Sequence, residues 1–460
     1  MTLIKSISGI RGTIGGKPGE NLTPLDIVKF STAYGQWVKN QGESDAYTVV
    51  VGRDARLSGA MVQELVMNTL VGMGINIIDL GLSTTPTVEV AVAMEKADGG
   101  IILTASHNPK QWNALKLLNN KGEFLNAAAG KEILELSENT DIQYAEIDDL
   151  GKITQIDDYI DRHIEEILKL QWVDVEKIKN ANLKAVVDGV NSTGGIAIPK
   201  LLQKLGVETV ELYCEPNGEF PHDPEPLAKN LTAIFEKVTE TKSDLGIVVD
   251  PDVDRLAFVD EKGEMFGEEY TLVAVADYLL SKKKGNTVSN LSSSRALRDV
   301  TEKHGGTYSA SAVGEVNVVE KMKETNAFIG GEGNGGIIFP ELHYGRDSLV
   351  GTALFLTHLA EKQISVSELK KEYPAYYMSK SKIELTPEID VDNLLEQMKN
   401  KYTKEEISTI DGVKIDFPEN WIHLRKSNTE PIIRIYTEAK SQQEADDLAN
   451  RFIKEMKSLI

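Results

Sequence analysis

The sequence is poor in three features that mark other classes of protein. It has one cysteine, Cys214, which excludes a disulfide within the chain and a metal site built from several cysteines. It has no apolar run of about 18 residues, the length that crosses a bilayer, and no basic-then-apolar secretory signal at its start. Basic residues are also few, 50 against 71 acidic ones, for a net charge of −21. We therefore expect a cytoplasmic protein with neither nucleic acid nor a membrane as partner.

The chain is long enough to form several buried cores, with 460 residues of which 41% are hydrophobic. Strand-like runs alternate with helical periodicity in three stretches, at 47–118, 183–250 and 286–329. This alternation predicts mixed or parallel sheets covered by helices, and hence an α/β fold.

After Pro374 the pattern changes. Strands are expected at 380–385, 407–417, 421–425 and 432–437, and helices at 391–402 and 442–459. The sequence thus predicts three α/β domains, at 1–155, 156–256 and 257–372, followed by a smaller α+β domain at 373–460.

The first candidate site is Ser106, in the segment Thr104-Ala-Ser-His-Asn-Pro109. It follows an apolar strand that begins near Gly99, so its hydroxyl is expected at the open end of a sheet, where α/β proteins place their reactive groups. A serine before Asn-Pro can equally serve only to form the turn.

Three aspartates, Asp250, Asp252 and Asp254, follow a second apolar strand. Because side chains alternate along an extended chain, this spacing can bring all three carboxylates to one side. Carboxylates so close repel one another unless a cation neutralises them, and all-oxygen ligation suits magnesium, manganese or calcium. The alternative is a solvated acidic turn.

Two further loops carry ligand-type groups. In Gly330-Gly-Glu-Gly-Asn-Gly-Gly336, Glu332 and Asn334 offer acceptors and donors suited to sugar hydroxyls, although a plain glycine-rich hairpin would look the same. The second loop, 425–434, concentrates anion-binding groups, since arginine pairs bidentately with phosphate, unless it is a surface loop of ion pairs. Its candidate residues are Arg425, Ser427, Asn428, Thr429 and Arg434.

These four segments, in this order, resemble the motifs of the α-D-phosphohexomutase superfamily. The resemblance extends to Ser8-Gly-Ile-Arg-Gly12 and to Gly52-Arg-Asp-Ala-Arg-Leu-Ser-Gly59, and covers nearly the whole chain. It implies four domains around a central cleft and interconversion of hexose 6-phosphate and hexose 1-phosphate. It also implies Mg²⁺ as cofactor, a phosphosugar as partner, and a hexose 1,6-bisphosphate as intermediate and activator, in a monomer or homodimer.

The resemblance also implies roles for individual residues. Ser106 would carry the phosphoryl group and contribute an oxygen to the metal, which the three aspartates would bind. Glu332 and Asn334 would contact the sugar, and 425–429 would bind phosphate. For proton transfer beside the nucleophile the candidates are Lys116, His107 and Arg11. Whether Lys116 or His107 is the general base stays open at this point.

The sequence departs from the family pattern in two places. Many members have serine at the position of Asn334 and histidine at that of Gly336, so the role of that histidine cannot be transferred. Members also commonly have Tyr-Asn-Gly before the lysine that matches Lys116, whereas this chain has Trp112-Asn-Ala-Leu. The variant Gly-Glu-Gly-Asn-Gly-Gly resembles a branch that contains phosphoglucosamine mutases and some broad phosphohexomutases.

The identity of the sugar depends on Glu315, in a segment that resembles a sugar-contacting loop of the family. A carboxylate there can pair with the 2-ammonium group of glucosamine, or it can simply favour the start of a helix. We expect glucosamine phosphate over mannose or glucose phosphate. Two other classes remain as alternatives, a metal-dependent phosphatase, which would release free phosphate, and a non-catalytic phosphosugar-binding protein.

Overall fold

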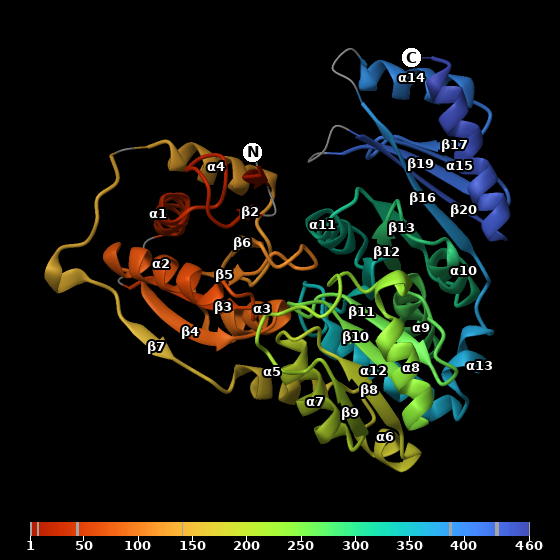
Figure 1. Cartoon of the computed structure of the whole chain (residues 1–460), viewed down its shortest axis with the longest axis horizontal. Helices are drawn as coiled ribbons and strands as arrows, with labels where there is room; N and C mark the ends of the chain where they lie inside the picture. The colour runs from red at the N-terminus through yellow and green to blue at the C-terminus, as the bar shows by residue number, and fades with distance from the viewer. Residues whose placement is uncertain are drawn as a thin grey trace. The chain divides into compact units, whose positions relative to one another are not determined.

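The computed structural model describes residues 2–6, 9–42, 46–139, 141–385, 389–427 and 432–459. The chain divides into two compact units. Unit 1 comprises residues 1–278 and 334–369, and unit 2 comprises residues 279–333 and 370–460. Figure 1 shows the helices and strands of both.

Unit 1 begins with a seven-stranded mixed sheet in the order β1-β2-β6-β5-β3-β4-β7. Strand β3 is parallel to β4 and β5, whereas β6 is antiparallel to β5 and β2. The strands are β1 Ile4–Ser6, β2 Gly9–Thr13, β3 Thr48–Arg53, β4 Asn76–Leu82, β5 Gly99–Leu103, β6 Trp112–Leu118 and β7 Ile153–Gln155.

Helices cover both faces of this sheet. Val49 and Val51 of β3 pack in one apolar cluster with α1 and α2, while Val50, which points the opposite way, packs in another with α3. Helix α3 begins cleanly because the Thr84 side chain accepts a hydrogen bond from the backbone N–H of Thr87. The helices are α1 Pro24–Asn40, α2 Gly59–Gly72, α3 Thr85–Glu95, α4 Ala127–Ser137 and α5 Tyr159–Lys169.

The second sheet of unit 1 has the order β11-β10-β8-β9 and places the three aspartates between β10 and β11. Strand β10 is parallel to β8 and antiparallel to β11, and both β10 and β11 are buried throughout. The elements are α6 Val175–Ala181, β8 Lys184–Asp188, α7 Gly194–Leu205, β9 Glu208–Leu212, α8 Thr232–Thr241, β10 Leu245–Val249 and β11 Leu256–Asp260.

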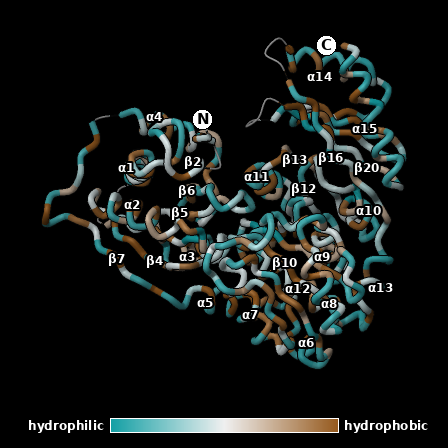
Figure 2. Tube along the Cα trace, in the orientation of Figure 1, coloured by the Kyte–Doolittle hydropathy of each residue, from teal (hydrophilic) through white to brown (hydrophobic). Residues whose placement is uncertain are grey.

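Helix α12 contributes much of the core below this sheet. Its Phe355 ring stacks on Phe258 of β11, with 3.8 Å between ring centroids, and Figure 2 shows its mostly hydrophobic course. Unit 1 also contains β15 Gly336–Ile338, α12 Ser348–Lys362 and most of α9 Glu268–Lys282 and α13 Val366–Lys370.

Unit 2 combines a parallel layer with an antiparallel sheet. Strand β12 is parallel to β13 and β14, and the five remaining strands form a sheet in the order β16-β20-β19-β18-β17. Met398 of α14 and Phe452 of α15 lie in the apolar cluster on that sheet. The elements are β12 Thr287–Asn290, α10 Ala296–Lys303, β13 Tyr308–Ser311, α11 Glu315–Thr325, β14 Ile329–Glu332, β16 Tyr377–Glu384, α14 Val391–Lys401, β17 Glu406–Ser408, β18 Val413–Asp416, β19 Trp421–Lys426, β20 Ile432–Ala439 and α15 Gln442–Lys457.

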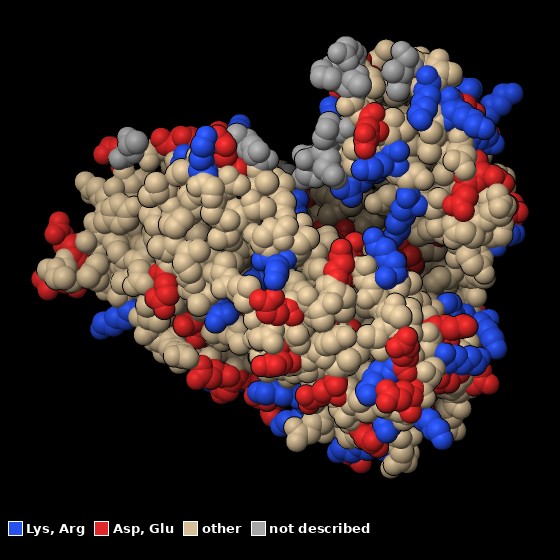
Figure 3. Space-filling model, in the orientation of Figure 1, with Lys and Arg blue, Asp and Glu red and all other residues tan. Residues whose placement is uncertain are grey.

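Basic and acidic side chains are interspersed on the face that Figure 3 shows. Exposed pairs such as Lys169 Nζ and Glu166 Oε1, 2.7 Å apart, are screened by water and contribute little to stability. The stability of each unit therefore depends mainly on its buried clusters.

The predicted fold class, three α/β domains with mixed sheets and a C-terminal α+β domain, is confirmed. The single strand expected at 407–417 is wrong in detail, because a turn with Gly412 at φ +74° divides it into β17 and β18. The second domain was expected to end at residue 256, but β11, which pairs with β10, runs from Leu256 to Asp260. The domain boundaries remain predictions. Among the described residues, no helix is both long and apolar enough to span a membrane.

Candidate active site

Ser106 lies just beyond β5 in a constrained backbone conformation. Its φ is +49°, which is uncommon for a residue with a side chain and is tolerated where the surroundings enforce it. Its backbone N–H donates to Thr104 Oγ1 at 2.9 Å, and its hydroxyl donates to Asp250 Oδ2 at 2.6 Å. His107 Nδ1 is 3.3 Å from the same hydroxyl. The structure thus brings the predicted nucleophile and the first predicted metal ligand into direct contact.

A buried guanidinium, that of Arg56, holds the Ser106 loop in place. Its Nε donates to Asp54 Oδ2 at 2.9 Å, and Asp54 also accepts from Thr104 Oγ1 at 2.7 Å. Its two Nη groups donate to four backbone carbonyls of the loop, those of Ser106, Asn108, Pro109 and Trp112. One arginine therefore fixes the path of the segment that presents the nucleophile.

The three aspartates converge as expected, although through a turn at 251–253 and not along an extended chain. They are fully buried, and one oxygen of each lies within 4.8 Å of those of the other two. Asp250 Oδ1 accepts from the backbone N–H groups of Asp254 and Arg255, both at 3.1 Å. The tight loop requires φ +65° at Val253, a strained value for a β-branched residue.

The donor set of this loop fits a hard divalent cation. Asp252 Oδ1 and Asp254 Oδ1 are buried and accept no hydrogen bond from any described residue. A buried carboxylate oxygen without a partner is costly, and an oxygen-binding cation would satisfy both. Burial and the charges of Asp254 and Asp252 raise the pKa of Asp250 well above its usual range, which reflects the same repulsion. The buried triplet can therefore bind a metal ion.

Two basic side chains balance part of this negative charge. Lys116 Nζ lies 2.8 Å from Asp252 Oδ2 and 3.3 Å from Asp254 Oδ2, and Arg346 Nη2 donates to Asp254 Oδ2 at 2.7 Å. Burial by itself would lower the pKa of Lys116, but the two aspartates raise it above its usual value. Burial and nearby cations, first Arg255, hold the pKa of His107 well below its usual value. At neutral pH the lysine is therefore charged and the histidine neutral.

Sequence reasoning missed Thr85, and for Arg346, just after the glycine-rich loop, it left two interpretations open, a further site contact or the start of a helix. Thr85 donates to Asp252 Oδ2 from its hydroxyl, at 2.6 Å, and to the Asp252 carbonyl from its backbone. Arg346 also occupies the space that a side chain at position 336 would need, since a Cβ added at Gly336 would lie 2.2 Å from Arg346 Cδ. The candidate Arg11 lies on β2 opposite Ala114 of β6, the strand that carries Lys116.

Hydrogen bonds from backbone N–H groups and from one side-chain amide position the predicted sugar-binding residues Glu332 and Asn334. In unit 2, Glu332 is the last residue of β14. Its Oε1 accepts hydrogen bonds from Asn290 Nδ2 at 2.8 Å and from the Gly314 N–H at 3.1 Å. Glu315 is buried in the first turn of α11, immediately after that glycine. In unit 1, Asn334 Oδ1 accepts from the Gly336 N–H at 3.1 Å. Unit 2 therefore brings Glu332 and the Glu315 loop together.

Asp411, which sequence reasoning also missed, connects that loop to the predicted phosphate loop within unit 2. Its Oδ2 lies 2.7 Å from Arg425 Nε and accepts from the Val313 N–H at 3.1 Å. Arg425 and Arg434 are opposite each other on β19 and β20, and the Ser427 N–H donates to the Ile432 carbonyl. The remaining candidates, Asn428 and Thr429, lie outside the described residues.

Comparison with known proteins identifies related sequences along the whole chain. Residues 3–143, 158–263 and 267–377 match the family models of phosphoglucomutase/phosphomannomutase alpha/beta/alpha domains I, II and III, and residues 382–455 match that of the C-terminal domain.

Two curated relatives and one solved structure extend this likeness. A phosphoglucomutase/phosphomannomutase of Thermococcus kodakarensis is 36% identical over 449 residues, covering 96% of this chain and 97% of its own. A phosphoglucosamine/phosphogalactosamine mutase of Sulfurisphaera tokodaii is 32% identical over 453 residues, covering 97% of both chains. The crystal structure of a phosphoglucomutase/phosphomannomutase family protein of Burkholderia thailandensis superposes with a TM-score of 0.83, at 26% identity, covering 99% of this chain and 98% of its own.

Proposed function

Since the chain belongs to the phosphoglucomutase/phosphomannomutase family and is a phosphomutase, we propose that it interconverts hexose 6-phosphates and hexose 1-phosphates through a phosphorylated Ser106. The observation that carries this proposal is the 2.6 Å contact between Ser106 Oγ and Asp250 Oδ2. This contact supports the proposal because it brings the Ser106 hydroxyl beside three buried carboxylates that can bind a cation.

The proposed reaction has two transfers. In the first, the bond between phosphorus and Ser106 Oγ breaks, a bond from phosphorus to a sugar hydroxyl oxygen forms, and the proton that the sugar hydroxyl loses is regained at Ser106 Oγ, which becomes a free hydroxyl. The product is a hexose 1,6-bisphosphate, which turns round and returns its other phosphoryl group to Ser106. When bound, Mg²⁺ on the aspartate triplet would supply positive charge against the phosphoryl oxygens.

Lys116 and His107 suit different parts of the proton transfer. The charged Lys116, held between Asp252 and Asp254, can donate a proton or stabilise negative charge, but it is a poor base at neutral pH. His107 is neutral and its Nδ1 lies 3.3 Å from Ser106 Oγ, so it can accept a hydrogen bond from the reacting group. We assign electrostatic stabilisation to Lys116, with Arg11 assisting it from β2, and orientation of Ser106 to His107.

Substrate recognition would use the remaining predicted residues. Arg425 and Arg434 have the guanidinium groups that clamp the phosphate not being transferred, together with Ser427, Asn428 and Thr429. Glu332, Asn334 and Glu315 would contact the sugar hydroxyls or amine. A hexose 1,6-bisphosphate would also activate the enzyme by phosphorylating Ser106. We expect a monomer or homodimer located in the cytoplasm.

The first prediction concerns the covalent intermediate. Incubation with a hexose 1,6-bisphosphate should phosphorylate Ser106, and Ser106→Ala should lower turnover at least about 10³-fold because the acceptor is removed. Peptide mass mapping locates the phosphate, and Ser31→Ala, in helix α1, is the matched control with near-normal turnover. Phosphate on another residue, an active Ser106→Ala, or inorganic phosphate as the main product would contradict the proposal, the last in favour of a phosphatase.

The second prediction concerns the phosphate clamp. Arg425→Lys should raise KM for the hexose phosphate roughly tenfold, with a smaller effect on kcat. A planar guanidinium can contact Asp411 through one edge and a phosphate through another, whereas a lysine ammonium group has no such pair of edges. Steady-state kinetics measure both constants. Arg451→Lys, in which the replaced arginine stacks on Phe417 and Phe452, is the control that should leave KM unchanged. An unchanged KM in Arg425→Lys would place the clamp elsewhere.

The third prediction concerns the sugar. We propose glucosamine phosphate as the preferred substrate, with mannose and glucose phosphates as the alternative. Glu315→Gln should lower kcat/KM about tenfold on glucosamine phosphate and less than about threefold on the other two, because a charged hydrogen bond is lost only with the amine. Glu320→Gln, exposed on the same helix, is the control. A wild type that prefers glucose or mannose phosphate, or an equal loss on all three sugars, would refute the assignment.

A further inference from the structure

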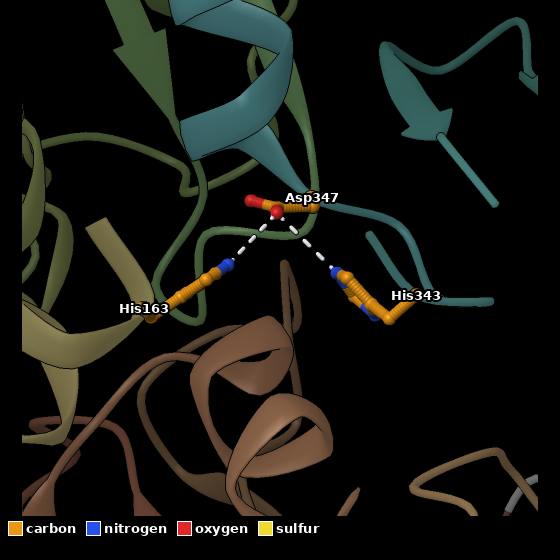
Figure 4. A group of neighbouring side chains, drawn as sticks. All are labelled: His163, His343 and Asp347. Carbon is orange, nitrogen blue, oxygen red and sulfur yellow. Dashed lines mark hydrogen bonds and ion pairs between the residues drawn. The ribbon is translucent and has the colours of Figure 1, made fainter. Parts of the chain in front are cut away.

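A second cluster of possible metal ligands lies in unit 1, formed by His163, His343 and Asp347 (Figure 4). Both imidazole rings direct Nε2 at one carboxylate oxygen, Asp347 Oδ2, at 3.1 Å from His163 and 3.3 Å from His343. The three side chains are nearly or fully buried. His163 lies on helix α5, His343 precedes α12, and Asp347 is the N-cap residue of α12. None of them takes part in the proposed phosphoryl transfer.

The three ligand atoms lie within 4.8 Å of one another, and the distances from Asp347 Oδ2 to the two Nε2 atoms match the edges of a metal coordination polyhedron. Metal–ligand distances of about 2.0–2.1 Å place tetrahedral ligand atoms about 3.3 Å apart, close to the nitrogen–oxygen separations in this cluster. Two imidazoles with one carboxylate and no thiolate suit a divalent transition metal, and zinc accepts this set without a strict geometric demand.

The atoms that would not bind the metal already have partners of the kind found around metal sites. His343 Nδ1 lies 3.2 Å from Glu89 Oε2, and His163 Nδ1 lies 3.1 Å from Thr87 Oγ1. Asp347 Oδ1 accepts from the backbone N–H of Leu349 at 2.8 Å. Such outer contacts fix the tautomer of a ligating histidine and leave Nε2 and Oδ2 for the ion.

The charges in the cluster also favour a cation. Two carboxylates, those of Glu89 and Asp347, are buried beside two imidazoles. With both histidines neutral, one divalent ion would balance the charge of the two carboxylates. Protonation of the imidazoles is the alternative way to balance that charge.

We propose that His163, His343 and Asp347 bind one zinc ion, with Glu89 and Thr87 orienting the histidines. The two ligands in the 343–347 segment flank Arg346, which contacts Asp254 at 2.7 Å, and the Ser348 N–H donates to the Val253 carbonyl. The ion would therefore be a structural centre that holds the segment behind the catalytic aspartates.

The test uses the full-length protein in excess Mg²⁺, so that the aspartate triplet is occupied. Zinc is added against a chromophoric chelator, bound zinc is counted by mass spectrometry of the metal, and X-ray absorption identifies its neighbours. We expect one zinc per chain with two imidazole nitrogens at about 2.0–2.1 Å. Because the aspartate triplet has no histidine, this signature separates the two sites without any variant.

Variants then assign the ligands. Glu89→Gln should weaken zinc binding about 10–100-fold, the usual effect of losing an outer carboxylate, and His163→Gln or His343→Gln should weaken it further. His358→Gln, another buried histidine of unit 1 with Asp277 3.8 Å away, is the control that should bind zinc normally. No zinc above background, oxygen-only coordination, or unchanged affinity in the His163 and His343 variants would overturn the proposal and leave a proton-linked network.

Discussion

The repulsion among three buried carboxylates is the constraint on which the rest of unit 1 depends. Asp250, Asp252 and Asp254 are fully buried within one short loop, and bringing such charges together out of water is unfavourable unless cations surround them. The structure supplies Lys116 from β6 and Arg346 from the segment before α12, and two carboxylate oxygens still have no hydrogen-bond donor among the described residues. The site can therefore bind one more cation, and a phosphoryl group on Ser106 would lie close to that cation.

Backbone strain accompanies this arrangement. Ser106 and Val253 both have positive φ, at +49° and +65°, and each unfavourable conformation is held by contacts from elsewhere in unit 1. Arg56 binds four carbonyls of the Ser106 loop, and the Ser348 N–H binds the Val253 carbonyl. Unit 2 in turn holds Glu332 and the Glu315 loop through Gly314, and Arg425 through Asp411. The proposal thus assigns phosphoryl transfer to groups of unit 1 and most recognition of the substrate to groups of unit 2.

The sequence predicted the fold class from local strand and helix patterns, whereas the convergence of Ser106 with Asp250, 144 residues away, was expected only from the resemblance to the phosphohexomutase motifs. It could not predict Arg56 or Thr85 as supporting residues, since their partners lie 50 and 167 residues away in sequence and no local periodicity records such contacts. Arg346 was undecided for the same reason. Strand β7 was missed because it has three exposed residues, too few for an alternating pattern. The two histidines and Asp347 gave no signal as a group, since His163 is separated from Asp347 by 184 residues.

The most direct test of the account is a titration of the full-length protein with Mg²⁺. Calorimetry measures the binding of Mg²⁺, and thermal unfolding measures the stabilisation that it causes. If the buried carboxylates require a cation, one Mg²⁺ should bind per chain and the stabilisation should grow as RT ln(1 + [Mg²⁺]/Kd). Asp252→Asn should bind Mg²⁺ at least about tenfold more weakly, because one ligand charge is removed. A melting temperature independent of Mg²⁺, or an equal stabilisation in Asp252→Asn, would contradict the account.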